Sequence, residues 1–187
     1  MTAAISATIK GASAQMLGAL GGILLHCLQQ LVFGKRFGQV ILGADHAATH
    51  KLPEEVFLGF RLFPDMFPLS RQVQIATDQL TRGAARLAGT DLPSFPDVET
   101  SFAQLIERTT KANAYVQGAS SEAMDKRAET VINIPIGGGQ ELPMTCSAYL
   151  SSFVFPNLYF HSATAYNILR HNGVLLGKRD FLRPPGQ

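Results

Sequence analysis

The stretch PLSRQVQIATDQLTRGAARLAG, residues 68–89, carries the clearest structural signal in the sequence. Its apolar residues recur at steps of three and four, which is the period of one buried helix face. The residues on this face are Leu69, Val73, Ala76, Leu80, Ala84 and Leu87. Pro68 stands where the first turn of a helix tolerates proline, and Gly89 stands where helices commonly end. The stretch therefore predicts a long amphipathic helix that buries this face against other elements.

Three other stretches have the same periodicity, and they run from Ile5 to Cys27, from Asp97 to Gly118 and from Thr145 to Gly173. Asp97 and Thr145 are the expected N-caps of the last two, and Arg170 and His171 complement the dipole of the final turn. The apolar face expected after Asp97 consists of Val98, Phe102, Leu105, Thr109, Ala112 and Val116. Four long amphipathic helices predict an all-α four-helix bundle.

The remaining segments complete a single domain over residues 1–187. Residues 25–60 form an elaborated connection between the first two helices, because glycines interrupt the helical period over 25–43 and a short helix and a proline-started turn follow. The stretch TVINIPIGGGQELPMT, residues 130–145, predicts a small β-hairpin that Pro135 and Pro143 keep at an edge, outside the core.

Composition excludes several classes of protein. The chain has 46% hydrophobic and 16% charged residues, which is the balance of a folded domain and not of a disordered one. Its 16 Lys and Arg oppose 14 Asp and Glu and are scattered, so nucleic acid is not an expected partner. The apolar run of residues 16–33 is too interrupted for a membrane span and lacks a cleavage site, so we expect a cytoplasmic protein. Cys27 and Cys146 have no paired or ligand-type spacing, and no cofactor is expected.

His161 is the leading candidate for a functional group. It lies within an otherwise apolar helix, and a buried polar group without a partner costs about 2–7 kcal/mol. Pro156, one turn earlier, should kink the helix, while Asn157 and Thr164 share the face of His161. The simpler interpretation is a core histidine that a neighbouring group satisfies.

A polar ribbon of Arg71, Gln74 and Asp78 follows the helix of residues 68–89. A solvated face explains this ribbon equally well. The functional interpretation is that Asp78 hydrogen-bonds one ring nitrogen of His161 while Arg71 holds an anionic group of a substrate. Asp65, between Pro64 and Pro68, is a candidate cap or a residue at the mouth of the pocket. His46 and His50 have a spacing that suits zinc, but no H-E-x-x-H pattern accompanies them, so we favour a solvated face.

Four blocks of the sequence together resemble the signatures of an uncharacterised domain-of-unknown-function family in the DinB-like (DinB/YfiT) superfamily. The blocks are LFPDMFPLSRQVQIATD (62–78), ARLAG (85–89), PNLYFHSATAYNILRHNG (156–173) and GKRDFL (177–182). The resemblance implies an up-down-down-up four-helix bundle that is often dimeric. It also implies a divalent metal held by one histidine of the second helix and a His-x-x-x-His pair of the last. Here only His161 fits that pattern, because Ala165 and Asp78 stand at the other positions.

These observations leave three functional hypotheses. The first is a small-molecule enzyme or binder that works without a bound metal, with His161, Asp78 and Arg71 as catalytic residues. Its expected substrate-binding residues are Asn157, Gln74, Tyr166 and Asp65. The second is a metal-dependent transferase or hydrolase, and the third is a non-catalytic dimeric interaction or stress protein. A homodimer is expected because the first helix and residues 31–43 carry more apolar residues than a four-helix core absorbs.

Overall fold

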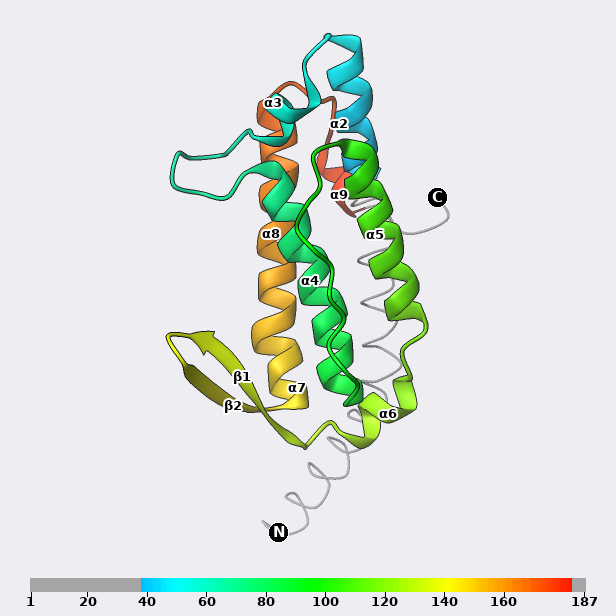
Figure 1. Cartoon of the computed structure of the whole chain (residues 1–187), viewed down its shortest axis with the longest axis vertical. Coiled ribbons are helices and arrows are strands. Elements are labelled where there is room, and N and C mark those ends of the chain that lie inside the picture. The colour runs from blue at the N-terminus through cyan, green and yellow to red at the C-terminus, as the bar shows by residue number, and fades with distance from the viewer. Residues whose placement is uncertain (1–37, 183–187) are drawn as a thin grey trace, which may run out of the picture.

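The computed structural model describes residues 38–182 of the chain. Within this range, helices α2, α4, α5 and α8 pack around one core and a β-hairpin projects from one end (Figure 1). The helices are α2 (Gly38–Thr49), α3 (Glu54–Leu58), α4 (Leu69–Ala88), α5 (Phe102–Gln117), α6 (Ser121–Lys126), α7 (Cys146–Tyr149), the π-helical segment η1 (Leu150–Val154), α8 (Phe155–His171) and α9 (Lys178–Leu182). The strands are β1 (Val131–Gly137) and β2 (Gln140–Thr145). The first predicted helix, residues 5–27, lies outside the described residues.

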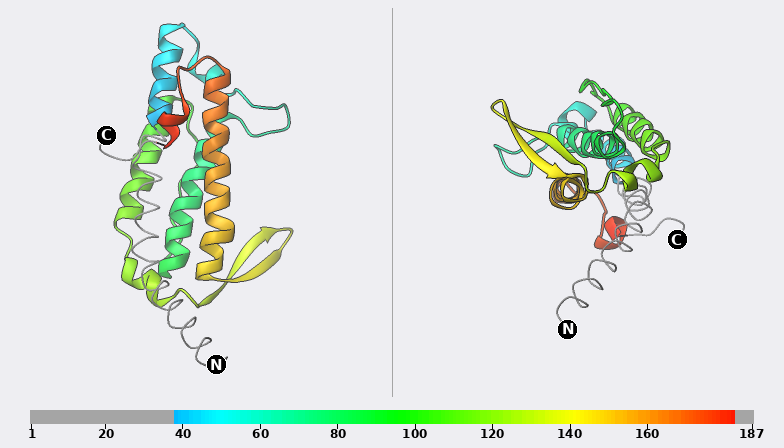
Figure 2. Two further views of the ribbon diagram at one scale, coloured as in Figure 1. Left: turned by 180° about the vertical axis from the view of Figure 1, so that it is seen from behind. Right: turned by 90° about the horizontal axis from the view of Figure 1, so that it is seen from below.

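The order of the helices is up-down-down-up, as Figure 1 shows by following the colours along the chain. Helix α2 ascends, α4 and α5 both descend, and α8 ascends again. Two helices in succession can run the same way because residues 89–101 cross back along the bundle as an extended segment, drawn in front of α4 in Figure 1. The view from behind in Figure 2 shows α4 between α5 and α8. Helix α4 packs against both α5 and α8, while α2 packs against α5 and α8 at one end. The predicted all-α bundle with a hairpin excursion is confirmed.

Helix α4 is the element that the sequence predicts best. It runs from Leu69 to Ala88, and every residue of the predicted apolar face is buried. Its C-cap is Gly89, whose φ of +74° is the left-handed conformation that glycine adopts at little cost. Gly83 serves close packing instead, because an added Cβ would lie only 3.1 Å from Val154 Cγ1 of η1.

The start of α5 differs from the prediction. Ser101 is the N-cap and accepts a hydrogen bond from the Gln104 backbone, whereas the expected cap, Asp97, belongs to the crossover segment. Val98, expected on the apolar face, is 70% exposed. The reason is tertiary: Asp97 pairs with arginines of α4 and α5, which keeps its carboxylate away from the helix terminus. The predicted end at Gly118 is correct.

Residues 38–43, interpreted from the sequence as irregular, belong to helix α2. Gly43 interrupts the apolar pattern because the helix approaches its neighbours closely there. A Cβ at Gly43 would lie 2.9 Å from Leu169 Cδ2 and 3.0 Å from Phe102 Cε1. The glycine therefore reflects helix packing against α5 and α8, not a break in the helix.

The last helix begins as predicted, with Thr145 Oγ1 accepting a hydrogen bond from the Ala148 backbone. A kink is predicted at Pro156, and what the structure shows there is the π-helical segment η1 directly before α8. Proline has no N–H to donate, and a π-turn is a common way of absorbing such a missing bond. Ser151 and Ser152, five and four residues before Pro156, are exposed, so water can satisfy their carbonyl groups.

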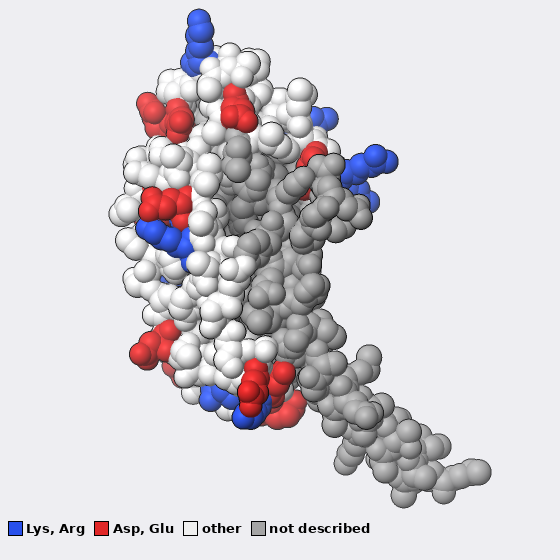
Figure 3. Space-filling model, turned by 90° about the vertical axis from the view of Figure 1, so that its right-hand side faces the viewer, with Lys and Arg blue, Asp and Glu red and all other residues white. Residues whose placement is uncertain are grey.

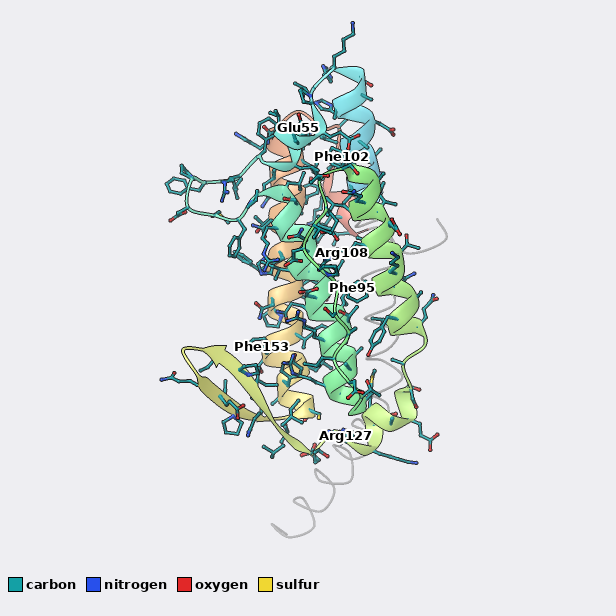
Figure 4. All side chains as sticks on the ribbon, in the orientation of Figure 1. Glu55, Phe95, Phe102, Arg108, Arg127 and Phe153 are labelled. Atoms are coloured by element: carbon teal, nitrogen blue, oxygen red, sulfur yellow. The ribbon has the colours of Figure 1, made fainter. Side chains whose placement is uncertain are left out.

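The hairpin pairs β1 and β2 in antiparallel register, with Val131 opposite Thr145 and Ile134 opposite Leu142. Its turn uses three glycines, residues 137–139, all with positive φ. Ile134 is buried against the core, and Phe153 of η1 lies between the hairpin and the long helices (Figure 4). The predicted excursion is confirmed.

None of the helices described here is long and apolar enough to cross a membrane. On the side of the molecule drawn in Figure 3, positive and negative side chains are intermixed over the described surface.

Arg108 of α5 is buried to 3% exposure and lies beside Phe95 of the crossover segment (Figure 4). Its guanidinium donates to Asp78 Oδ1 at 2.7 Å, to Glu99 Oε1 at 2.9 Å and to the Pro96 carbonyl at 3.1 Å. It also pairs with Asp97 at 3.0 Å, and its Nε donates to Thr77 Oγ1 at 2.8 Å. One side chain therefore joins α4, α5 and the crossover segment.

Replacing Arg108 with alanine is expected to lower the free energy of unfolding by about 3 kcal/mol or more, because the Asp78 and Glu99 carboxylates lose their buried partner. Lys111→Ala is the matched control on the same helix, since Lys111 forms an exposed pair with Glu107. That control should cost at most about 0.5 kcal/mol. Urea unfolding followed by circular dichroism measures both values. Equal losses in the two variants would show that the buried network contributes nothing special.

Candidate functional site

His161 lies where α8 packs against the first turns of α4, and it is 8% exposed. Its Nδ1 makes a 2.7 Å hydrogen bond with Gln72 Oε1 of α4. Gln72 therefore satisfies the Nδ1 atom of the buried imidazole. The partner is not the predicted one, because Asp78 makes no hydrogen bond with His161.

The orientation of the Gln72 amide fixes the tautomer of His161. Gln72 Nε2 donates to the Phe67 carbonyl at 2.9 Å, and a carbonyl oxygen can only accept. The amide oxygen must therefore face the imidazole, so Nδ1 must be the donor and carry the ring proton. In the neutral ring, Nε2 then holds the lone pair.

Nε2 of His161 has no hydrogen-bond partner among residues 38–182 and is not among their fully enclosed unpaired atoms. Burial lowers the pKa of the imidazole below its ordinary value of 6.5, and the positive charge of Arg71 lowers the pKa further. His161 is consequently neutral at pH 7. A basic nitrogen that is unpaired and not fully enclosed, on a neutral and oriented imidazole, is the arrangement that a general base requires.

Arg71 lies near His161, as the ribbon on α4 predicts. Its Nη1 contacts the Asp97 carboxylate and donates weakly to Gln74 Oε1 at 3.3 Å. Gln74 in turn donates to Glu99 Oε2 at 2.8 Å. The ribbon is therefore not simply a solvated face, because Arg71 and Gln74 hold the crossover segment against α4.

The prediction that Asp78 orients His161 is wrong in its geometry. Asp78 Oδ1 accepts from Arg108 at 2.7 Å, and Oδ2 pairs with Arg82 at 3.4 Å. Burial raises the pKa of Asp78 above 3.8, and the attraction of the two arginines only partly offsets this effect. Asp78 thus belongs to the network of Arg108.

Glu99 completes that network from the crossover segment. Burial raises its pKa, but hydrogen bonds from Arg108 and Gln74 outweigh burial, so the pKa lies below 4.5. The three carboxylates of Asp78, Asp97 and Glu99 face three arginines, which are Arg71, Arg82 and Arg108. The network is balanced in charge.

The other predicted site residues have partners other than the imidazole or none among the described residues. Asn157 and Thr164 lie on the same side of α8 as His161. Each donates a 2.7 Å hydrogen bond to a backbone carbonyl four residues earlier, Asn157 to Phe153 and Thr164 to Phe160. Tyr166 packs edge-on against Phe181 at 5.8 Å. Asp65 is exposed in the loop of residues 60–68, where it has no hydrogen bond or ion pair to any described residue.

The sequence interpretation missed Gln72 and Arg108. Both carry a detectable signal, since each is a polar residue placed on the buried face of its helix. Gln72 stands three residues after Leu69, and Arg108 stands three after Leu105. A polar side chain at such a position must find a partner in the core.

The residues around His161 do not fit the metal site that the DinB-like resemblance implies. Ala165 offers no ligand, and the Asp78 carboxylate is bound to two arginines. Within residues 38–182 there is no group of three His, Cys, Asp or Glu side chains arranged to hold a metal ion. His46 and His50, with ring centroids 4.2 Å apart, line an open cavity of about 340 Å³ with Asp45.

These features define a DinB-like four-helix bundle with a histidine–glutamine pair between two of its helices. The family model "Domain of unknown function (DUF1993)" matches residues 38–182, and the chain belongs to this family. A crystal structure of a DinB family member from Shewanella denitrificans is similar at a TM-score of 0.80 and 34% identity. The match covers 93% of this chain and 97% of that chain. No curated protein matches the sequence.

Gln72→Glu is expected to raise the pKa of His161, because a carboxylate in place of the amide stabilises the imidazolium. Gln79→Glu is the control, because it adds the same charge two helical turns away, roughly 10 Å along α4. Titration of the ring 15N signals by NMR measures both pKa values. The wild-type neutral ring should show its proton on Nδ1, and a proton on Nε2 would contradict the tautomer derived above.

The lowered pKa of His161 also predicts how stability depends on pH. The unfolded chain takes up a proton near pH 6.5 while the folded chain resists it, so stability rises with pH up to about 6.5. This contribution to the free energy of unfolding is lost as the pH falls from 6.5 through the pKa of His161 in the folded protein. His161→Gln should therefore have a flatter profile of unfolding free energy below pH 6.5, measured by urea unfolding at a series of pH values. Parallel profiles would show that His161 has an ordinary pKa.

Proposed function

We propose that this protein is a small-molecule enzyme in which His161 Nε2 transfers a proton to and from the substrate. The observation that supports this proposal is the hydrogen-bond chain from the His161 Nδ1–H through Gln72 to the Phe67 carbonyl. This chain orients the ring and reserves Nε2 for chemistry.

The proposed reaction is removal of a proton from carbon next to a carbonyl group, followed by its return to a different atom or elimination of a leaving group. Nε2 accepts the proton and becomes the imidazolium Nε2–H. Charge then develops on the carbonyl oxygen, and the guanidinium of Arg71 lies close enough to His161 to affect the imidazole electrostatically. Arg71 is the group that stabilises this developing charge. Isomerases, cyclases and lyases of this kind need no group beyond an acid/base and an anion anchor.

A buried network elsewhere supports a preorganised site. Arg71 is held by Asp97, and Asp97 is held in turn by the buried Arg108. A proton-transfer site benefits from groups whose positions are fixed before the substrate arrives. Before substrate binds, the members of the Arg108 network thus hold Arg71 near His161.

The test is exchange of carbon-bound hydrogen for deuterium in D₂O, followed by proton NMR, with a panel of small 2-oxo acids, 3-oxo acids and aldehydes. Wild-type protein should accelerate exchange next to the carbonyl group of at least one compound. His161→Gln should reduce this rate by about 100-fold or more, the usual contribution of a general base.

His171→Gln is the control, because His171 is exposed in the last turn of α8. It should leave the exchange rate unchanged. Since the pKa of His161 is below 6.5, the rate should be constant above that pH and fall as the imidazole becomes protonated. Exchange that is absent with every compound, or unchanged in His161→Gln, would contradict the proposed function.

A further inference from the structure

Two exposed aromatic side chains border the His161 site. The Phe160 ring lies edge-on to the imidazole, with centroids 5.2 Å apart, and Phe160 is 56% exposed. Phe67 is 52% exposed, and the Arg71 guanidinium lies 6.0 Å from its ring centroid. Apolar rings left in water next to a polar site are a common feature of ligand pockets, where they remove the apolar part of a ligand from water.

Phe67 is held in this exposed position by the loop of residues 60–68, which projects from the bundle in Figure 1. The base of the loop is closed by a hydrogen bond from Leu69 N to the Phe60 carbonyl at 2.9 Å, and a turn bond joins Met66 N to the Phe63 carbonyl at 3.0 Å. Gln72 Nε2 holds the Phe67 carbonyl itself. These bonds fix the backbone at Phe67, so the point from which its ring extends is set before a ligand arrives.

Arg71 retains donors for an anion. Its hydrogen bonds to Gln74 and Asp97 both use Nη1, so Nε and Nη2 have no partner among residues 38–182. Asp97 also accepts from Arg108 at 3.0 Å, and Arg108 is buried. A carboxylate that displaces Asp97 from Arg71 therefore leaves Asp97 paired. The Asp97–Arg71 contact can exchange for a ligand without leaving a charge unpaired.

From these contacts we infer that the His161 site takes an amphipathic carboxylate, that is, a carboxylic acid carrying an aryl or alkyl group. The carboxylate binds the Arg71 guanidinium in place of Asp97, and the apolar group packs against Phe67 and Phe160. This inference rests on the proposed function for the location of the site, and it adds the chemical class of the substrate.

The experiment titrates the full chain with three probes while the ring 15N signals of His161 are followed by NMR. The probes are 3-phenylpropanoate, which has both features, acetate, which has only the carboxylate, and 3-phenylpropan-1-ol, which has only the apolar group. We expect 3-phenylpropanoate to bind at least about tenfold more tightly than either of the others, because a charge-assisted hydrogen bond and ring burial each contribute a measurable affinity.

Two pairs of variants test the residues. Arg71→Gln should weaken 3-phenylpropanoate binding about tenfold or more, whereas Asp97→Asn should strengthen it several-fold by removing a competing carboxylate. Phe67→Ser and Phe160→Ser should weaken 3-phenylpropanoate but not acetate. Phe63→Ser is the matched control, because Phe63 is 63% exposed on the same loop and should leave the affinity unchanged.

Equal affinity for the acid and the alcohol, an unchanged affinity in Arg71→Gln, or failure of all three probes to bind would overturn the inference. A weakened affinity in Asp97→Asn would also overturn it. Failure of the inferred ligand class can be distinguished from failure of the proposed function. Selective binding of 3-phenylpropanoate without any His161-dependent exchange would leave the ligand class standing and remove the proton-transfer chemistry.

Discussion

The arrangement of this bundle depends on the contacts of the buried Arg108 guanidinium. An up-down-down-up order requires a long return segment between two parallel helices, and such a segment has few hydrogen bonds of its own. Arg108 supplies them, because it binds Glu99, Asp97 and the Pro96 carbonyl of that segment while also binding Asp78 and Thr77 of α4. A charge buried in this way is stable only with several partners in good geometry, which constrains all three elements at once.

The same constraint reaches the candidate site through Asp97. This carboxylate lies between Arg108, which is buried, and Arg71, which is half-exposed near His161. On the other side of α4, Gln72 joins His161 of α8 to the Phe67 carbonyl in the loop of residues 60–68. The first turns of α4 thus fix an imidazole, a guanidinium and an aromatic ring from three different elements. The site is a consequence of how α4 packs, not an addition to it.

Local signals made α4, the hairpin and the start of the last helix predictable from the sequence. Pro68, Gly89 and Thr145 act through their own backbone neighbours, so their roles follow from the sequence alone. Local signals do not decide whether Asp97 or Ser101 is the N-cap of α5, since this choice depends on arginines elsewhere in the chain. Likewise, the sequence alone indicates Gly43 as a helix breaker, and only its close contact with Leu169 and Phe102 explains why a glycine stands there.

The site residues show the same limit more sharply. Asp78 and Gln72 are six residues apart, which places them about 120° apart around α4. His161 meets the side of α4 that carries Gln72, and Asp78 instead meets α5 through Arg108. Charge and spacing favoured the aspartate as the partner of the histidine, because a carboxylate is the commoner companion of a catalytic imidazole. Only the rotation of α4 about its axis decides between them, and that rotation is set by the whole core.

The choice of an amide as partner has a chemical consequence. An imidazole whose Nδ1–H is held by a neutral acceptor resembles the histidines of metal sites, where the other nitrogen is the ligand. Arg71 places a positive charge near the imidazole, and this charge opposes a bound cation for the same reason that it lowers the pKa of the ring. It attracts an anion instead. The proposed proton transfer and the proposed carboxylate ligand both depend on this arrangement of a neutral base next to a guanidinium, bordered by exposed aromatic rings.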